Sequence, residues 1–167
     1  RECCCISSGS RAGQGCGKYI ISDKTDPICD STINALDILV LNIDIGMNIL
    51  WDKSIGGQKG EENPSVIRNA DNNGIIFSCT SYSDSSCEKT EHNRAFPILT
   101  GDYWMCSLDT AGNKIWDKTY GGAGTGSNSD LTPQIIQLPS GNFIIAGVSN
   151  APVSGDKTVS NYSSFTD

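Results

Sequence analysis

The sequence predicts an all-β protein made of β-propeller-like blades, each a sheet of four short antiparallel strands. Three observations predict this class. First, the segments 37–57 and 102–122 are two copies of one repeat, in which Asp, Asp, Asn, Trp, Asp, Lys, Gly and Gly recur 65 residues apart. Second, the apolar runs are short and rich in Ile, Leu and Val, which favours strands over helices. Third, Gly, Asn, Asp and Pro separate these runs, as is typical of hairpin turns.

The first hairpin of each repeat consists of two such runs. We expect strands at 38–43 and 49–55 in the first copy, and at 103–108 and 114–120 in the second. Asp109 begins the second turn and Gly112 ends it, which indicates a left-handed residue late in the loop. Met47 stands at the place of Gly112 in the first copy, so the two turn types are open to differ.

The second hairpin of each repeat follows a Gly-Gly pair and a loop with one proline, Pro64 or Pro133. Its predicted strands are 65–69 and 75–80 in the first copy, and 134–138 and 143–148 in the second. No stretch has helical periodicity. An Asp/Glu-Lys-Thr signature also recurs, at 23–25, 88–90 and 156–158, with spacings of 65 and 68 residues. The loop that carries it is therefore part of the repeat.

The repeat divides the chain into three parts. Residues 1–36 are expected to hold the end of a preceding blade, with a strand at 2–7 or 17–21, and a Cys-rich loop; 37–101 form repeat 1 and 102–167 repeat 2. At a period of 65–68, the 167 residues hold about two and a half repeats, whereas a closed propeller has four to eight blades. We expect this chain to belong to a larger propeller or repeat assembly, as a piece of a longer chain or as one of several copies joined edge to edge.

Trp51 and Trp116 occupy equivalent places in the second strand of each repeat. A tryptophan repeated in this way is expected to pack between neighbouring blades, where burial of the ring stabilises the stack. The alternative is a platform on which a sugar stacks.

Composition and charge narrow the possible partners. The formal net charge of −7 argues against nucleic acid and anionic membranes as partners, and no apolar run is long enough for membrane insertion.

The eight cysteines suit disulfides in an oxidising compartment. A zinc site is the less favoured alternative, since no C-x-x-C motif occurs and His92 is the sole histidine. Strand proximity suggests a pairing of Cys79 with Cys106 or Cys87. The other cysteines are Cys3, Cys4, Cys5, Cys16 and Cys29.

The second repeat resembles tandem repeats of secreted Bacteroidetes proteins, with the form DYW-x-x-x-LD-x-x-GNK-x-WDKT-(F/Y)-GG followed by SGDKT. The matching segments are 102–104, 108–109, 112–114, 116–122 and 154–158, and the first repeat matches less closely. The resemblance covers residues 23–167. It implies a large secreted or cell-surface protein, often exported by the type IX system and linked to adhesion. Cys79, Cys87 and Cys106 depart from the family pattern.

Few residues offer chemistry. Oxygens of Asp71-Asn72-Asn73 and Asp109 could bind calcium, although such runs more often build turns. His92 with a cysteine could form a thiol nucleophile, but its loop favours a solvated side chain. We therefore predict no catalytic, cofactor-binding or metal-binding residue and no cofactor, with calcium as the alternative.

We expect an extracellular structural or adhesive repeat protein that stacks on further repeats or on copies of itself, either as a filament or as part of a large surface protein. One alternative is a glycan- or peptide-binding propeller module, with exposed loop aromatics at Tyr82, Tyr162 and Phe165. The other is a fragment of a propeller enzyme, which would need inward-facing polar clusters.

Overall fold

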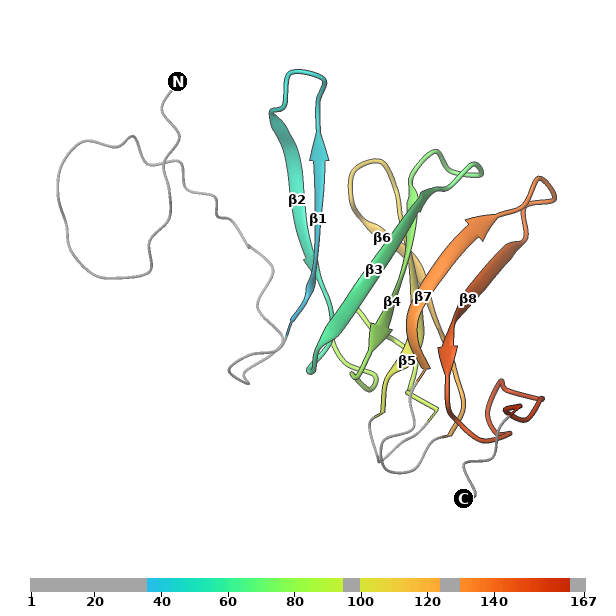
Figure 1. The fold of residues 1–167 in the computed structure, drawn as a ribbon. Helices are drawn as coiled ribbons and strands as arrows, with labels where there is room; N and C mark the ends of the chain where they lie inside the picture. Colours follow the sequence, from blue (N-terminus) through green and yellow to red (C-terminus); the bar gives the residue numbers. More distant parts are fainter. Residues whose placement is uncertain (1–35, 95–99, 124–129, 163–167) are drawn as a thin grey trace, which may run out of the picture.

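The computed structural model describes residues 36–94, 100–123 and 130–162, and the strand expected at 2–7 or 17–21 lies outside them. The described residues form strands and turns and no helix, so the all-β prediction is confirmed. Among them there is no apolar helix of membrane-spanning length. The strands follow one another along the chain (Figure 1): β1 (Ile38–Ile43), β2 (Ile49–Ile55), β3 (Glu61–Arg68), β4 (Ile75–Ser81), β5 (Asp102–Leu108), β6 (Lys114–Tyr120), β7 (Asp130–Gln137) and β8 (Phe143–Ser149).

These strands form three antiparallel sheets within the described ranges. The central sheet has the order β3-β4-β5-β6, so each strand pairs with its neighbour in sequence. The β1–β2 hairpin packs on one face of this sheet and the β7–β8 hairpin on the other (Figure 1). The central sheet is a four-stranded meander of the kind expected for a blade.

The central sheet crosses the boundary between the two repeats. Strands β3 and β4 are the second hairpin of repeat 1, and β5 and β6 are the first hairpin of repeat 2. The β4–β5 register runs without a break from Ile75 opposite Leu108 to Ser81 opposite Asp102. The grouping of four strands within each repeat is therefore shifted by one hairpin, because a sequence period does not say where a sheet begins.

Two apolar cores fill the spaces between the sheets. The back face of the central sheet, defined by Phe77, Cys79, Trp104, Cys106 and Leu108, packs against Ile38 and Ile55 of the β1–β2 hairpin. Its front face, defined by Ile76, Met105 and Trp116, packs against Ile135, Phe143 and Ile145 of the β7–β8 hairpin. Alternate residues of β5 thus serve opposite cores, as the two-residue period of a strand requires.

The two first-hairpin turns have the same geometry despite the difference at Met47. The amide of Met47 donates to the carbonyl of Asp44 (3.0 Å), and the amide of Gly112 donates to that of Asp109 (3.1 Å). Met47 has a φ of 63° and Gly112 a φ of 81°. Met47 therefore adopts the left-handed conformation that glycine adopts more easily, and the turn types do not differ.

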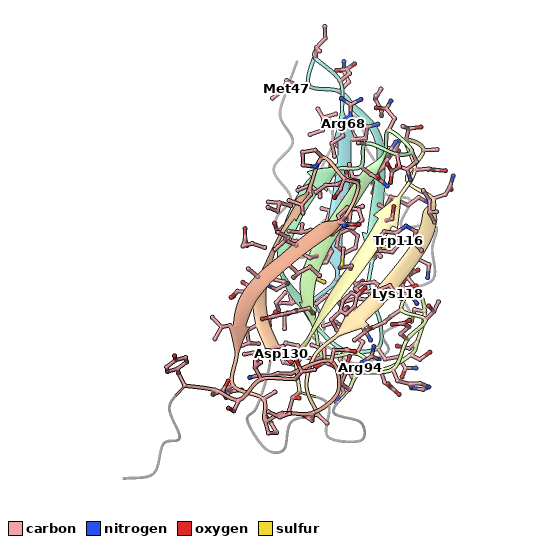
Figure 2. The ribbon with its side chains drawn as sticks, turned by 90° about the vertical axis from the view of Figure 1, so that its right-hand side faces the viewer. Met47, Arg68, Arg94, Trp116, Lys118 and Asp130 are labelled. Carbon is pink, nitrogen blue, oxygen red and sulfur yellow. The ribbon has the colours of Figure 1, made fainter. Side chains whose placement is uncertain are left out.

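Both repeated tryptophans are half-buried and contact a neighbouring sheet. The Trp51 indole nitrogen donates to the carbonyl of Thr110 in the β5–β6 turn (3.0 Å). A methyl group at Gly112 would lie 3.1 Å from the Trp51 ring, so this glycine lets the turn approach closely. Trp116 packs against Phe143 of β8 at a centroid distance of 6.4 Å (Figure 2 labels Trp116).

Strands β3 and β7 begin earlier than predicted. The segments containing Pro64 and Pro133 were expected to be loops, yet both prolines lie inside strands. The register shifts between Glu62 and Ser65 in β3, and between Leu131 and Gln134 in β7. Bulges of this kind accommodate a residue without an amide hydrogen.

Candidate functional site

The signature Glu88-Lys89-Thr90 packs over the repeated Trp-Asp-Lys motif of β6. The Thr90 amide donates to Asp117 Oδ2 and its hydroxyl to Oδ1, both at 2.8 Å. Asp117 also accepts from Trp104 Nε1 (3.0 Å) and Lys114 Nζ (2.9 Å). Burial favours a higher pKa for Asp117, but these hydrogen bonds outweigh it and hold the pKa below its usual value. We call this arrangement the Asp117 clamp, and its role is to fasten a loop to a strand.

The lysine of the signature is also used in the fold. Lys89 is buried, and its Nζ donates to the carbonyl of Glu91 (2.6 Å). Burial lowers the pKa of Lys89 to about 8, although Asp102 and other nearby carboxylates act in the opposite direction. Lys157, its equivalent, donates to the carbonyl of Ala151 (2.7 Å). Both signature lysines in the described residues therefore fasten their own loops.

Two carboxylates enclose the first glycine of each Gly-Gly pair. A methyl group at Gly121 would lie 2.4 Å from Asp102 Oδ1 and 2.8 Å from Asp130 Oδ2. At Gly56 the corresponding distances are 2.4 Å to Asp37 Oδ1 and 2.6 Å to Glu61 Oε2. A side chain at either glycine would force a carboxylate to move, which accounts for the repeated glycine.

The electrostatics of the second acidic pair resemble those of a general acid. Burial, together with the charge of Asp130, raises the pKa of Asp102 to about 7, and the Arg94 amide, which donates to Asp102 Oδ2 (2.6 Å), opposes the shift. Such a pKa suits proton transfer near neutral pH. Asp102 is 0% exposed, however, so in this structure a substrate does not reach it. The pair therefore serves the packing of the strand ends.

The residues considered for calcium build turns. Asp109 Oδ1 accepts from the amides of Ala111 and Asn113, both at 2.8 Å, and Oδ2 accepts from Asn113 Nδ2 (3.0 Å). Asn72 Oδ1 accepts from the Gly74 amide (2.9 Å). Within the described ranges, acidic, histidine and cysteine side chains do not gather into a group of three or more that could hold a metal ion.

The surroundings of His92 and of the two free cysteines, Cys79 and Cys106, differ from those of a catalytic thiol and its base. The Nδ1 atom of His92 lies 3.0 Å from both carboxylate oxygens of Asp84 in an exposed loop. Cys79 and Cys106 are free, buried thiols, so the suggested pairing of Cys79 with Cys106 or Cys87 is wrong. Burial raises the pKa of Cys79 well above its usual value and that of Cys106 to about 12. Neither thiol is activated as a nucleophile.

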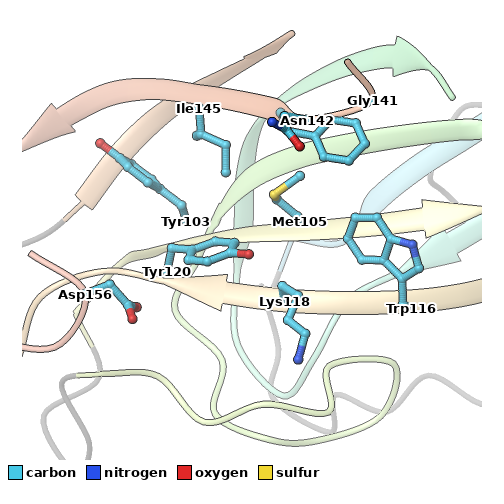
Figure 3. A pocket seen from close by; sticks show the side chains of 10 residues that line it. Tyr103, Met105, Trp116, Lys118, Tyr120, Gly141, Asn142, Ile145 and Asp156 are labelled. Carbon is cyan, nitrogen blue, oxygen red and sulfur yellow. The ribbon is translucent and has the colours of Figure 1, made fainter. Parts of the chain in front are cut away.

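An open cleft of about 910 Å³ lies between the β5–β6 hairpin and β8 (Figure 3). We call it the aromatic cleft. The Tyr103 hydroxyl donates to the carbonyl of Val148 (3.1 Å) and joins the two sides. Lys118 and Asp156 supply charge at its border. Its aromatic lining consists of Tyr103, Trp116, Tyr120 and Phe143.

Of these aromatic residues the sequence singled out Trp116 alone; its candidates for binding were in loops. Tyr82 is half-buried, Tyr162 is fully exposed, and Phe165 lies outside the described residues. Comparison of the repeats contained a signal for the cleft: Tyr103 and Tyr120 replace Ile38 and Ile55 at equivalent places. Two isoleucines that are buried in one hairpin become two partly exposed tyrosines in the other.

Comparisons of the chain with models of protein families, with curated proteins and with solved structures found no match. The function must therefore be argued from the repeat and the cleft.

Proposed function

We propose that the chain is a structural repeat module of a secreted or cell-surface protein, and that its blades stack on further repeats. The observation that carries the proposal is the use of the repeated polar residues. The carboxylate of Asp117 holds a loop, that of Asp109 holds a turn, and Lys89 and Lys157 fasten their own loops. A repeat whose signature residues build the blade itself serves architecture.

The two ends of the described sheets support stacking. Apolar side chains are exposed on the outer surfaces of both flanking hairpins, including Leu39 of β1 and Val148 of β8. Exposed apolar patches of this kind mark protein contacts. The secreted location rests on the eight cysteines and on the resemblance to secreted repeat proteins.

The experiment is the mass of the native chain in solution, measured by light scattering over a range of concentrations with and without reductant. We expect a mass above the 17.8 kDa of one chain. A fall in mass on reduction would place disulfides in the contacts. A monomer at every concentration would contradict stacking between copies.

A second candidate is a glycan-binding module, which the aromatic cleft favours. Aromatic faces stack on sugar rings, and Lys118, Asn142 and Asp156 offer polar contacts beside them. Titration of soluble oligosaccharides, followed by tryptophan fluorescence, to which Trp116 contributes, and by calorimetry, tests this function. No change in fluorescence or heat with a broad set of oligosaccharides would contradict it.

A further inference from the structure

The outer edges of β8 and β1 are equivalent, in the repeat, to the two strand edges that pair with each other in β4 and β5. Strand β4 pairs with β5, but β8, the equivalent of β4, pairs only with β7 among the described strands. Strand β1, the equivalent of β5, pairs only with β2 among them, so the strand expected at 2–7 or 17–21 and a β8 strand of another copy are the two candidates for its other edge. The sequences of β8 and β1, FIIAGVS and ILVLNI, contain no charged residue or proline. Natural sheets use such residues to prevent edge pairing.

We propose that the β8 edge and the aromatic cleft receive the β1–β2 hairpin of a second copy, head to tail. The inference rests on the proposed stacking function and gives it a specific interface. The β4–β5 register serves as the template. Transferred to equivalent residues, it places Phe143 opposite Ile43 of the second copy and Ser149 opposite its Asp37. The result is a four-stranded sheet, β7-β8-β1-β2, like the central one.

The side chains that would meet correspond to side chains already packed together. In the back-face core, Trp104 packs with Ile38 and Ile55 and is 0% exposed. The equivalent of Trp104 is Leu39, which is 62% exposed in a single chain. The equivalents of Ile38 and Ile55 are Tyr103 and Tyr120 of the aromatic cleft. Leu39 of the second copy would therefore enter the cleft between the two tyrosines.

The front-face core gives an independent correspondence. There Ile76 and Ile67 pack with Ile135 and Phe143. The equivalents of Ile76 and Ile67 are Ile144 and Ile136, which are 47% and 53% exposed. The equivalent of Ile135 is Val66, 62% exposed. One junction between copies would cover these exposed residues from both ends of the chain.

Two polar contacts can be transferred in the same way. Trp51 donates to the carbonyl of Thr110, so Trp116 would donate to the carbonyl of Ile45 in the β1–β2 turn of the second copy. Thr90 donates twice to Asp117. Thr158, which is exposed, is one equivalent of Thr90, and Asp52 of the second copy is the equivalent of Asp117. The junction thus repeats an apolar core, a tryptophan contact and a clamp.

The experiment uses two full-length variants, each blocking one end. Leu39→Lys places a charge on the entering hairpin, and Tyr120→Lys places one in the cleft that receives it. We expect each variant alone to lose at least about tenfold in association, because a lysine would be buried without a partner. An equal mixture of the two should form a complex of about twice 17.8 kDa, since each variant keeps the end that the other lacks. Val153→Lys, at an exposed loop residue, is the control and should associate like the wild type.

The outcomes separate this inference from the proposed function. If the wild type associates and the two variants associate equally well, stacking stands and this interface is wrong. If the variants are monomers and their mixture remains monomeric, the contact is not head to tail. If the wild type is a monomer throughout, both stacking of copies and this interface are overturned, and the cleft is left to a hairpin of a longer chain. Near-ultraviolet circular dichroism of each variant checks that the lysine has not unfolded it.

Discussion

The Asp117 clamp gives the sharpest prediction about stability. In the variant Asp117→Asn one carboxylate oxygen becomes an NH2 group that cannot accept a hydrogen bond. Either the Thr90 amide and the Trp104 indole lose their acceptor, or the Thr90 hydroxyl and Lys114 lose theirs. The side chain of Asp117 is 2% exposed, so water cannot easily replace it.

A buried donor without an acceptor costs about 1–3 kcal/mol, so two donors give about 2–6 kcal/mol. Losing the hydrogen bonds to Oδ1 costs less free energy, because the hydroxyl of Thr90 can rotate to another acceptor and Lys114 Nζ also donates to the carbonyl of Glu88. We therefore expect the free energy of unfolding to fall by about 2–4 kcal/mol.

The assay is urea unfolding at neutral pH, followed by tryptophan fluorescence, to which the buried Trp104 contributes. Asp71→Asn, which changes an exposed turn carboxylate, is the control and should stay within about 0.5 kcal/mol. The pKa of Asp117 lies below its ordinary 3.8, so its contribution exists above that pH and is lost as the pH falls through the folded value. The asparagine variant should lack this acid-side loss. A variant within 1 kcal/mol of the wild type would refute the clamp.

Three further predictions concern the buried groups. The folded pKa of Asp102, about 7, lies above its ordinary 3.8, so stability should decline as the pH rises between these values, and Asp102→Asn should flatten that decline in urea titrations. Gly121→Ala should lower the melting temperature more than Gly141→Ala. A methyl group at Gly121 would lie 2.4 Å from a carboxylate oxygen, whereas a methyl group at Gly141 would have no atom within 4 Å and would only be strained by the positive φ. Equal shifts in melting temperature would contradict this. Cys79 and Cys106 should resist iodoacetamide in the folded protein and react in urea, as mass spectrometry would show, and rapid labelling of the folded chain would contradict their burial.

Most strands could be predicted from the sequence because their ends coincide with turn residues. The expected bounds of β1, β2 and β6 agree with the structure, where apolar runs stop at Asp, Asn or Gly. β3 and β7 were predicted too short, since Pro64 and Pro133 suggested loops, whereas bulges hold them inside the strands. A proline indicates where the hydrogen bonding between two strands is interrupted, but it does not show whether the strand continues beyond that point.

The aromatic cleft could not be predicted in the same way, because it depends on how the β7–β8 hairpin packs on the central sheet. Tyr103 and Tyr120 look like ordinary alternating strand residues, and only the three-dimensional order of the hairpins leaves them open. The acidic pair at Asp102 and Asp130 was missed for a related reason: the two residues are 28 positions apart and meet only where β5 and β7 begin.

The aromatic cleft by itself would suit a sugar or a hairpin, and the β8 edge distinguishes them. A sugar stacked on Tyr103 and Tyr120 leaves the outward amides and carbonyls of β8 to water. It also leaves Ile144 and Val148 exposed, because these side chains alternate with Phe143 and Ile145 and point away from the cleft. A hairpin in the register of β5 supplies hydrogen bonds to the edge, and its partner sheet covers the outer apolar residues. One occupant then accounts for the cleft, the edge and the exposed face together, whereas a sugar accounts for the first alone.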